Sequence, residues 1–201
     1  MGTVLDYLKS SGDLGFWKDP FNDVDALVLS MLSYLPFKDI VPGVDEKEKI
    51  ALEEAAARYF SEHPSHKEDP ENIGLTVSPS MDQELIQILK MTSKSARYAK
   101  IRLSHFVEKT ESPVEQQFAA ITYSLPNAKR KKVIAFRGTD RTLIGWKENF
   151  ELAYMKEVPA QESASMYLNR EISVLSGKVT VCGHSKGGNL AVYAASRLKG
   201  I

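Results

Sequence analysis

The sequence holds one cysteine, Cys182, so no disulfide can form within the chain. A chain without disulfides suits a reducing compartment. Its first residues do not follow the basic-then-apolar order of a signal peptide, and no apolar run is long enough to span a bilayer. We therefore expect a cytoplasmic protein without a transmembrane segment.

Neither sign of charge is in excess, because 26 Lys and Arg residues balance 26 Asp and Glu residues. A balanced chain offers no broad basic surface to a polyanion, so we expect no nucleic-acid partner. The His, Cys and Asp residues lack the spacing of a metal site, and we expect neither a metal nor a cofactor. The length of 201 residues fits a single domain.

The most informative motif is Gly-His-Ser-Lys-Gly over residues 183–187. The β-rich run Val179–Cys182 precedes it, and a helical stretch rich in Ala and Leu follows. A G-x-S-x-G sequence between a strand and a helix is the signature of a nucleophile elbow, a tight turn that exposes a serine hydroxyl. The motif therefore predicts Ser185 as a catalytic nucleophile.

The glycines around Ser185 have a steric role in such a turn. A Cβ at Gly183 or Gly187 would clash with the adjacent strand or helix. Gly188 would allow close packing of the helix on the sheet. The side chain of Lys186 is predicted to be solvated, on the exposed face of that helix.

Residues 1–100 are predicted to form a helical segment that packs on the core or covers it as a lid. Apolar residues at helical spacing predict a helix over 23–35, which ends before a proline. An amphipathic pattern predicts a second helix over 45–62. The polar, proline-bounded stretch 63–72 is predicted to be a loop.

Residues 101–201 are predicted to form the N-terminal part of an α/β core. The pattern predicts three strands joined by turns as an antiparallel meander, then two helices, and then the strand before Ser185. The resulting fold class is an α/β-hydrolase-like mixed sheet, in which the meander leads into parallel strands. The predicted strands are 101–107, 117–123 and 132–136, and the predicted helices are 146–154 and 161–175.

A second motif, Phe-Arg-Gly-Thr-Asp over residues 136–140, closes the third predicted strand. A glycine and a hydroxyl residue at a strand end can direct donors toward an oxyanion. Thr139 would be one oxyanion donor and the backbone N–H of Lys186 the other. The alternative interpretation is an ordinary strand-end turn in which Arg137 forms a buried ion pair.

The two motifs together, V-x-A-F-R-G-T over 133–139 and G-H-S-K-G-G over 183–188, resemble the class 3 (fungal-type) lipases. More closely, the chain resembles a bacterial family of lipase-like α/β hydrolases. The resemblance implies Ser185 as nucleophile and Thr139 and Lys186 as oxyanion donors. His184, Asp140 and Arg137, which lie beside these residues in the two motifs, are candidates for supporting residues behind the site. Where the lipases usually carry an aspartate, this chain has Asn149.

A hydrolase of this fold needs an acid and then a histidine after the serine. Residues 186–201 contain no Asp, Glu or His. We expect the triad acid and base to lie beyond residue 201, and this chain alone to be inactive. A sheet cut at this point would also invite association through its exposed edge.

An upstream histidine acting as the base is the alternative, since chain order differs between unrelated triads. His184 should point away from the nucleophile, as the neighbour in an elbow does. His105 alternates with apolar residues and is expected to be half-buried with its polar groups satisfied. His63 and His66 fall in the predicted loop and are expected to be exposed.

Three functions remain open from the sequence. The first is hydrolysis of a lipid or small-molecule ester by Ser185. The second is a non-catalytic, hydrolase-like module that binds a ligand or partner, because a serine without a base is a weak nucleophile. The third is thioester hydrolysis or acyl transfer, which uses the same elbow.

Overall fold

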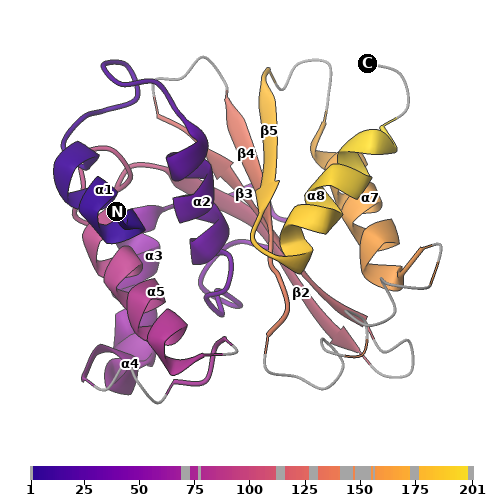
Figure 1. Ribbon diagram of the computed structural model, residues 1–201, viewed down its shortest axis with the longest axis horizontal. Coiled ribbons are helices and arrows are strands. Elements are labelled where there is room, and N and C mark those ends of the chain that lie inside the picture. The colour runs from indigo at the N-terminus through magenta and orange to yellow at the C-terminus, as the bar shows by residue number, and fades with distance from the viewer. Residues whose placement is uncertain are drawn as a thin grey trace.

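The computed structural model describes residues 2–68, 73–76, 78–111, 116–126, 131–140, 147, 155, 157–172 and 177–198. Within these ranges the protein has a mixed α/β fold, with one sheet between two groups of helices (Figure 1). The helix predicted over 146–154, with Asn149 in it, lies outside the described residues apart from isolated positions. No helix of the described ranges is long and apolar enough to cross a membrane.

The described helices and strands are listed here with their bounds. The helices are α1 (Val4–Ser11), α2 (Asp23–Leu32), α3 (Leu52–Glu62), α4 (Pro64–Glu68), α5 (Pro79–Thr92), α7 (Pro159–Glu171) and α8 (Lys186–Ser196). The strands are β1 (Ile50–Ala51), β2 (Arg102–Glu111), β3 (Gln116–Ser124), β4 (Lys132–Phe136) and β5 (Val179–Gly183).

The strands lie in the sheet in the order of the chain, β1-β2-β3-β4-β5. Each neighbouring pair from β1 to β4 is antiparallel, and β4 and β5 are parallel. The predicted mixed α/β sheet, with a meander leading into parallel pairing, is therefore confirmed at this level. The register pairs Phe136 with Gly183, so both strands end at the same edge of the sheet.

The two faces of β4 bury their side chains in different hydrophobic clusters, as the two-residue period of a strand requires. Val133 and Ala135 pack with the N-terminal helices. Ile134 and Phe136 pack with α7 and α8. Figure 1 shows the N-terminal helices on the left of the sheet and α7 and α8 on the right.

Three predictions in the first hundred residues are wrong in detail. The helix predicted over 45–62 begins only at Leu52, because Ile50 and Ala51 pair with β2 instead. The helix predicted over 23–35 ends at Leu32 and continues as turns with i→i+3 hydrogen bonds. The predicted loop 63–72 contains the short helix α4.

Candidate active site

Ser185 is an exposed residue between β5 and α8, with φ 55° and ψ −126°. A serine rarely adopts a positive φ, and such strain costs on the order of 1–3 kcal/mol. Backbone hydrogen bonds hold the turn, from Gly187 N to His184 O at 3.0 Å and from Gly188 N to Ser185 O at 2.9 Å. The turn therefore presents the serine at the carboxyl edge of β5.

The glycines of the turn stand where no side chain fits. A Cβ on Gly183 would overlap the backbone of Gly187, and a Cβ on Gly187 would overlap the carbonyl of Phe136 in β4. A Cβ on Gly188 would lie 3.2 Å from the Gly183 carbonyl oxygen, a tight but less severe approach. Close contact between α8 and the ends of β4 and β5 thus depends on these glycines.

The loop that follows β4 reaches the same turn. A Cβ on Gly138 would lie 2.5 Å from the backbone oxygen of His184, so the two backbones are in direct contact. The next residue, Thr139, has a buried Oγ1 that makes no hydrogen bond with the described part of the chain. A buried hydroxyl without a partner is uncommon and carries a desolvation cost. The loop thus contacts the serine turn at Gly138, and the residue that follows Gly138 carries an unsatisfied buried hydroxyl.

Arg137 makes the buried ion pair of the alternative interpretation. Its side chain is 7 % exposed, and its guanidinium pairs with Glu108 of β2, whose side chain is 26 % exposed. Its Nε donates to Ser33 O at 2.9 Å and its Nη2 to Leu35 O at 3.4 Å, at the carboxyl end of α2. Arg137 therefore links the loop after β4 to the N-terminal helices, while half-buried Asp140 lies in the same loop.

The His184 ring points to the N-terminal helices. Its Nδ1 lies 3.1 Å from the Tyr34 hydroxyl, and the two rings meet edge to face with centroids 6.0 Å apart. Burial, opposed in part by Arg137, raises the pKa of Tyr34 to about 12. This phenol therefore stays protonated over the whole working range of pH.

The Lys186 side chain is not solvated, which corrects the prediction. It is 3 % exposed, and its Nζ donates to the Gln117 carbonyl at 3.0 Å and lies 3.4 Å from Gln117 Oε1. The Lys186 side chain therefore extends from the first turn of α8 to the start of β3. Its residue type indicates exposure, but the position at the first turn of α8 faces the core.

The other histidines lie away from Ser185. His105, at a bulge of β2, has its Nδ1 2.6 Å from the buried carboxylate of Glu171. Because β2 and β5 are three strands apart, roughly 14 Å separates their backbones. His63 and His66 stack with centroids 4.8 Å apart, and both are half-buried rather than exposed as predicted. No described histidine contact reaches the serine.

The Cys182 thiol is a poor nucleophile near neutral pH, although it precedes Ser185 by only three positions. Burial raises the pKa of its thiol to about 11. The thiolate is the reactive form, so little of it exists near neutral pH. Within the described residues, no group of three or more metal-ligating side chains comes together.

Sequence reasoning missed two contributors, Tyr34 and Gln117. Tyr34 stands in an apolar helical pattern that indicates only burial, and nothing in the pattern shows where its hydroxyl points.

A groove beside β2, about 860 Å³ in volume, is lined by segment 38–46 and by Phe106–Glu108 and does not include Ser185.

The fold and this site define a mixed α/β protein with an exposed serine in a strand–turn–helix. The Mbeg1-like family model matches residues 92–200, more than half of the 201 residues, and the chain belongs to the Mbeg1-like family. Membership supports a relation to lipase-like proteins at the level of the family. No curated protein and no solved structure matches the chain.

Proposed function

We propose that the chain carries the nucleophile and the oxyanion site of a serine ester hydrolase of the lipase-like, α/β-hydrolase type. The substrate is a lipid or small-molecule carboxylic ester. One observation carries this proposal, the exposed Ser185 held at positive φ between β5 and α8. The contact of Gly138 with the His184 backbone adds support, because Thr139 directly follows Gly138 in the chain.

In the proposed reaction the Ser185 Oγ attacks the ester carbonyl carbon while a histidine takes its proton. The tetrahedral oxyanion accepts hydrogen bonds from the Lys186 backbone N–H and from Thr139. The N-terminus of α8 adds its partial positive charge at this point. Collapse of the tetrahedral intermediate expels the alcohol, which takes the proton from the histidine, and leaves an acyl-serine. Water, which gives a proton to the same histidine, hydrolyses the acyl-serine to the carboxylic acid and free serine.

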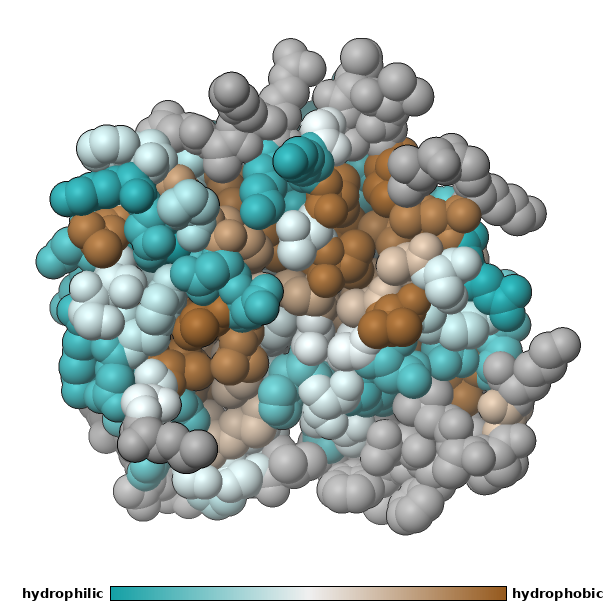
Figure 2. All heavy atoms as spheres, turned by 45° about the horizontal axis from the view of Figure 1, so that its top comes forward, coloured by the Kyte–Doolittle hydropathy of each residue, from teal (hydrophilic) through white to brown (hydrophobic). Residues whose placement is uncertain are grey.

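The histidine and acid of this proposal lie beyond residue 201, on a segment that pairs with β5. In support, β5 ends the strand order of the described sheet, and all five of its residues are half-buried. Four of the five residues of β4 beside it are fully buried. Hydrophobic residues gather across the middle of the face that carries β5 and α8 (Figure 2). Another strand would cover that edge.

A non-catalytic binding module is the second candidate function. It is favoured by the engagement of three described histidines elsewhere, His184 with Tyr34, His105 with Glu171 and His66 with Tyr59. A serine without a base reacts slowly. The two candidates differ in one measurable property, which is the nucleophilicity of Ser185.

The test is labelling by a fluorophosphonate probe, followed by mass spectrometry of the modified peptide. Two proteins are compared, the 201-residue chain and a polypeptide that continues beyond Ile201. Ser185→Ala should abolish labelling, and Ser196→Ala on the exposed side of α8 should leave it intact. Labelling of the longer polypeptide alone supports the proposal as stated. Labelling of the short chain refutes the external base, and absence of labelling in both folded proteins favours the binding module.

A further inference from the structure

The Tyr34 hydroxyl contacts both halves of the candidate site. On one side it forms a hydrogen bond of 3.1 Å with Nδ1 of His184, next to the candidate nucleophile. On the other side it packs against the backbone of Gly138, next to Thr139, where an added Cβ would lie 2.2 Å from the hydroxyl oxygen. A Cβ on Gly138 would overlap this hydroxyl and the His184 carbonyl at once, so the three groups are packed together.

The backbone on either side of Tyr34 is held by the same loop that Tyr34 contacts. Arg137 donates from Nε to Ser33 O and from Nη2 to Leu35 O. These carbonyls follow the last turn of α2, where helix carbonyls lack intrahelical donors and favour a cation. The Glu108 carboxylate fixes the far side of the guanidinium. Arg137 therefore bonds to the backbone on both sides of Tyr34, and Tyr34 in turn contacts Gly138.

The position of the Tyr34 hydroxyl leaves it little freedom to move. Tyr34 is 2 % exposed, so no solvent competes for its hydrogen bonds. The oxygen lies 3.1 Å from His184 Nδ1 on one side and against the Gly138 backbone on the other. A change at this one oxygen is therefore felt by both His184 and Gly138.

We infer that Tyr34 is a positioning residue, which sets the distance between the loop carrying Thr139 and the turn carrying Ser185. The inference rests on the proposed function for its catalytic meaning. An oxyanion site depends on donors placed correctly relative to the nucleophile, and an error of about 1 Å can cost about 100-fold in rate. The N-terminal helical segment thereby takes part in the site through one hydroxyl.

The simplest competing explanation is that Tyr34 only docks α2 on the sheet. Tyr123 provides the matched control, because it is fully buried and its hydroxyl donates to Leu29 O of α2 at 3.1 Å. Tyr123→Phe removes a buried phenol hydroxyl that bonds to α2 from β3, whereas the hydroxyl of Tyr34 bonds to His184. Tyr34→Phe removes a hydroxyl that contacts His184 and Gly138 and keeps the ring in place.

The experiment uses two readouts, with thermal unfolding to confirm that each variant is folded. Hydrogen exchange on the 201-residue chain follows the amides of residues 138 and 184–186. The rate of fluorophosphonate labelling is measured on the 201-residue chain or on the longer polypeptide, depending on which of them reacts with the probe in the test of the proposed function. We expect Tyr34→Phe to speed exchange at these amides and to slow labelling about 10- to 100-fold. Tyr123→Phe should leave both near the values of the unsubstituted protein.

The outcomes separate the two proposals. Unchanged labelling and exchange in Tyr34→Phe overturns the positioning role and leaves the hydrolase intact. Equal effects in Tyr34→Phe and Tyr123→Phe also overturn it, because docking of α2 then explains both. If no polypeptide is labelled but exchange increases only in Tyr34→Phe, the hydrolase is rejected and Tyr34 remains the residue that joins the two segments.

Discussion

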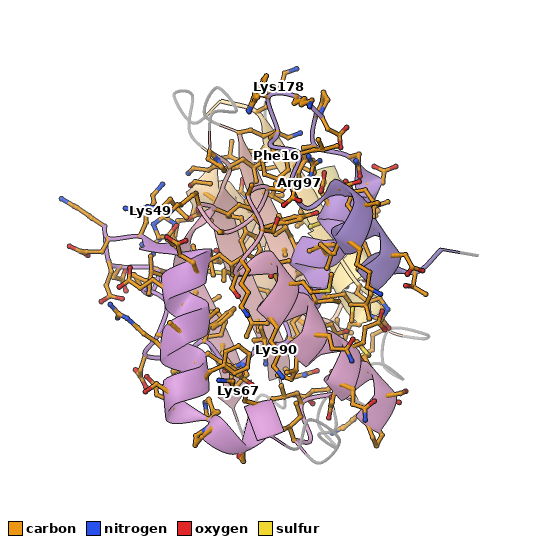
Figure 3. All side chains as sticks on the ribbon, turned by 90° about the vertical axis from the view of Figure 1, so that its left-hand side faces the viewer. Phe16, Lys49, Lys67, Lys90, Arg97 and Lys178 are labelled. Atoms are coloured by element: carbon orange, nitrogen blue, oxygen red, sulfur yellow. The ribbon has the colours of Figure 1, made fainter. Side chains whose placement is uncertain are left out.

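Asp25 and Arg97 form an ion pair in which both side chains are completely buried, with Oδ2 and Nη2 2.5 Å apart. Asp25 lies in the first turn of α2 and Arg97 follows α5, so the pair joins two helical parts of the N-terminal segment. Arg97 also donates to the carbonyls of Leu14 and Asp19 and stacks 4.4 Å from the Phe16 ring centroid. Figure 3 shows Arg97 beside Phe16 in this part of the molecule.

Removing one member of this pair should destabilise the protein strongly. Arg97→Met leaves the Asp25 carboxylate buried without its cation, which costs about 3–5 kcal/mol of unfolding free energy. The measurement is urea denaturation followed by circular dichroism. As the control, Arg58→Ala breaks an exposed pair with Glu54 on α3 and should cost less than about 0.5 kcal/mol. Similar losses in the two variants would contradict the structural role of Asp25 and Arg97.

Relief of the strain at Ser185 should stabilise the protein while removing its nucleophile. Glycine adopts the observed φ of 55° without steric cost. We expect the free energy of unfolding of Ser185→Gly to exceed that of Ser185→Ala by about 1 kcal/mol, because alanine keeps the strained Cβ. Chemical denaturation of the two variants makes the comparison. A glycine variant less stable than the alanine variant would show that the turn is not strained.

A methyl group on Gly187 should disrupt the turn. The added Cβ overlaps the Phe136 carbonyl, and backbone on both sides leaves no flexible side chain to move away. We expect Gly187→Ala to lose about 1–3 kcal/mol of stability and all probe labelling. Gly2→Ala is the matched control, because nothing lies within 4 Å of its Cβ and stability should not change. Normal labelling of Gly187→Ala would refute the steric argument.

Glu171 should make stability depend on acid pH. Burial by itself would raise the pKa of this carboxyl, but the hydrogen bond and charge of His105 bring it below the ordinary 4.5. A lowered folded-state pKa means that the carboxylate stabilises the fold above about pH 4.5, and that this contribution disappears as pH falls through the folded value. Urea denaturation between about pH 6 and pH 3 measures the loss.

Compared with the unsubstituted protein, Glu171→Gln should have a lower free energy of unfolding at neutral pH. That free energy should also fall less steeply as the pH is lowered. Glu62→Gln removes an exposed carboxylate at the end of α3 and serves as the control. An equally steep acid decline in Glu171→Gln and in the unsubstituted protein would show that another group controls it.

The local elements near Ser185 could be predicted because short-range chemistry specifies them. The β-rich run before Gly183 and the Ala-rich stretch after it form β5 and α8 as expected. The helix predicted over 45–62 begins too early, because the pairing of Ile50 with Leu103 joins residues far apart in the sequence. An amphipathic pattern records which side is apolar and contains no information about such a partner.

By itself the sequence determined the strand–serine–helix turn, the alternating strands and the absence of any disulfide, since these depend on residue type and spacing. Only the tertiary structure decided that Lys186 is buried against Gln117, that His105 pairs with Glu171, and that Tyr34 meets Gly138 and His184. Each of these contacts joins side chains brought together by the packing of helices on the sheet. Their energies depend on burial and on distances of about 3 Å, which no one-dimensional pattern contains.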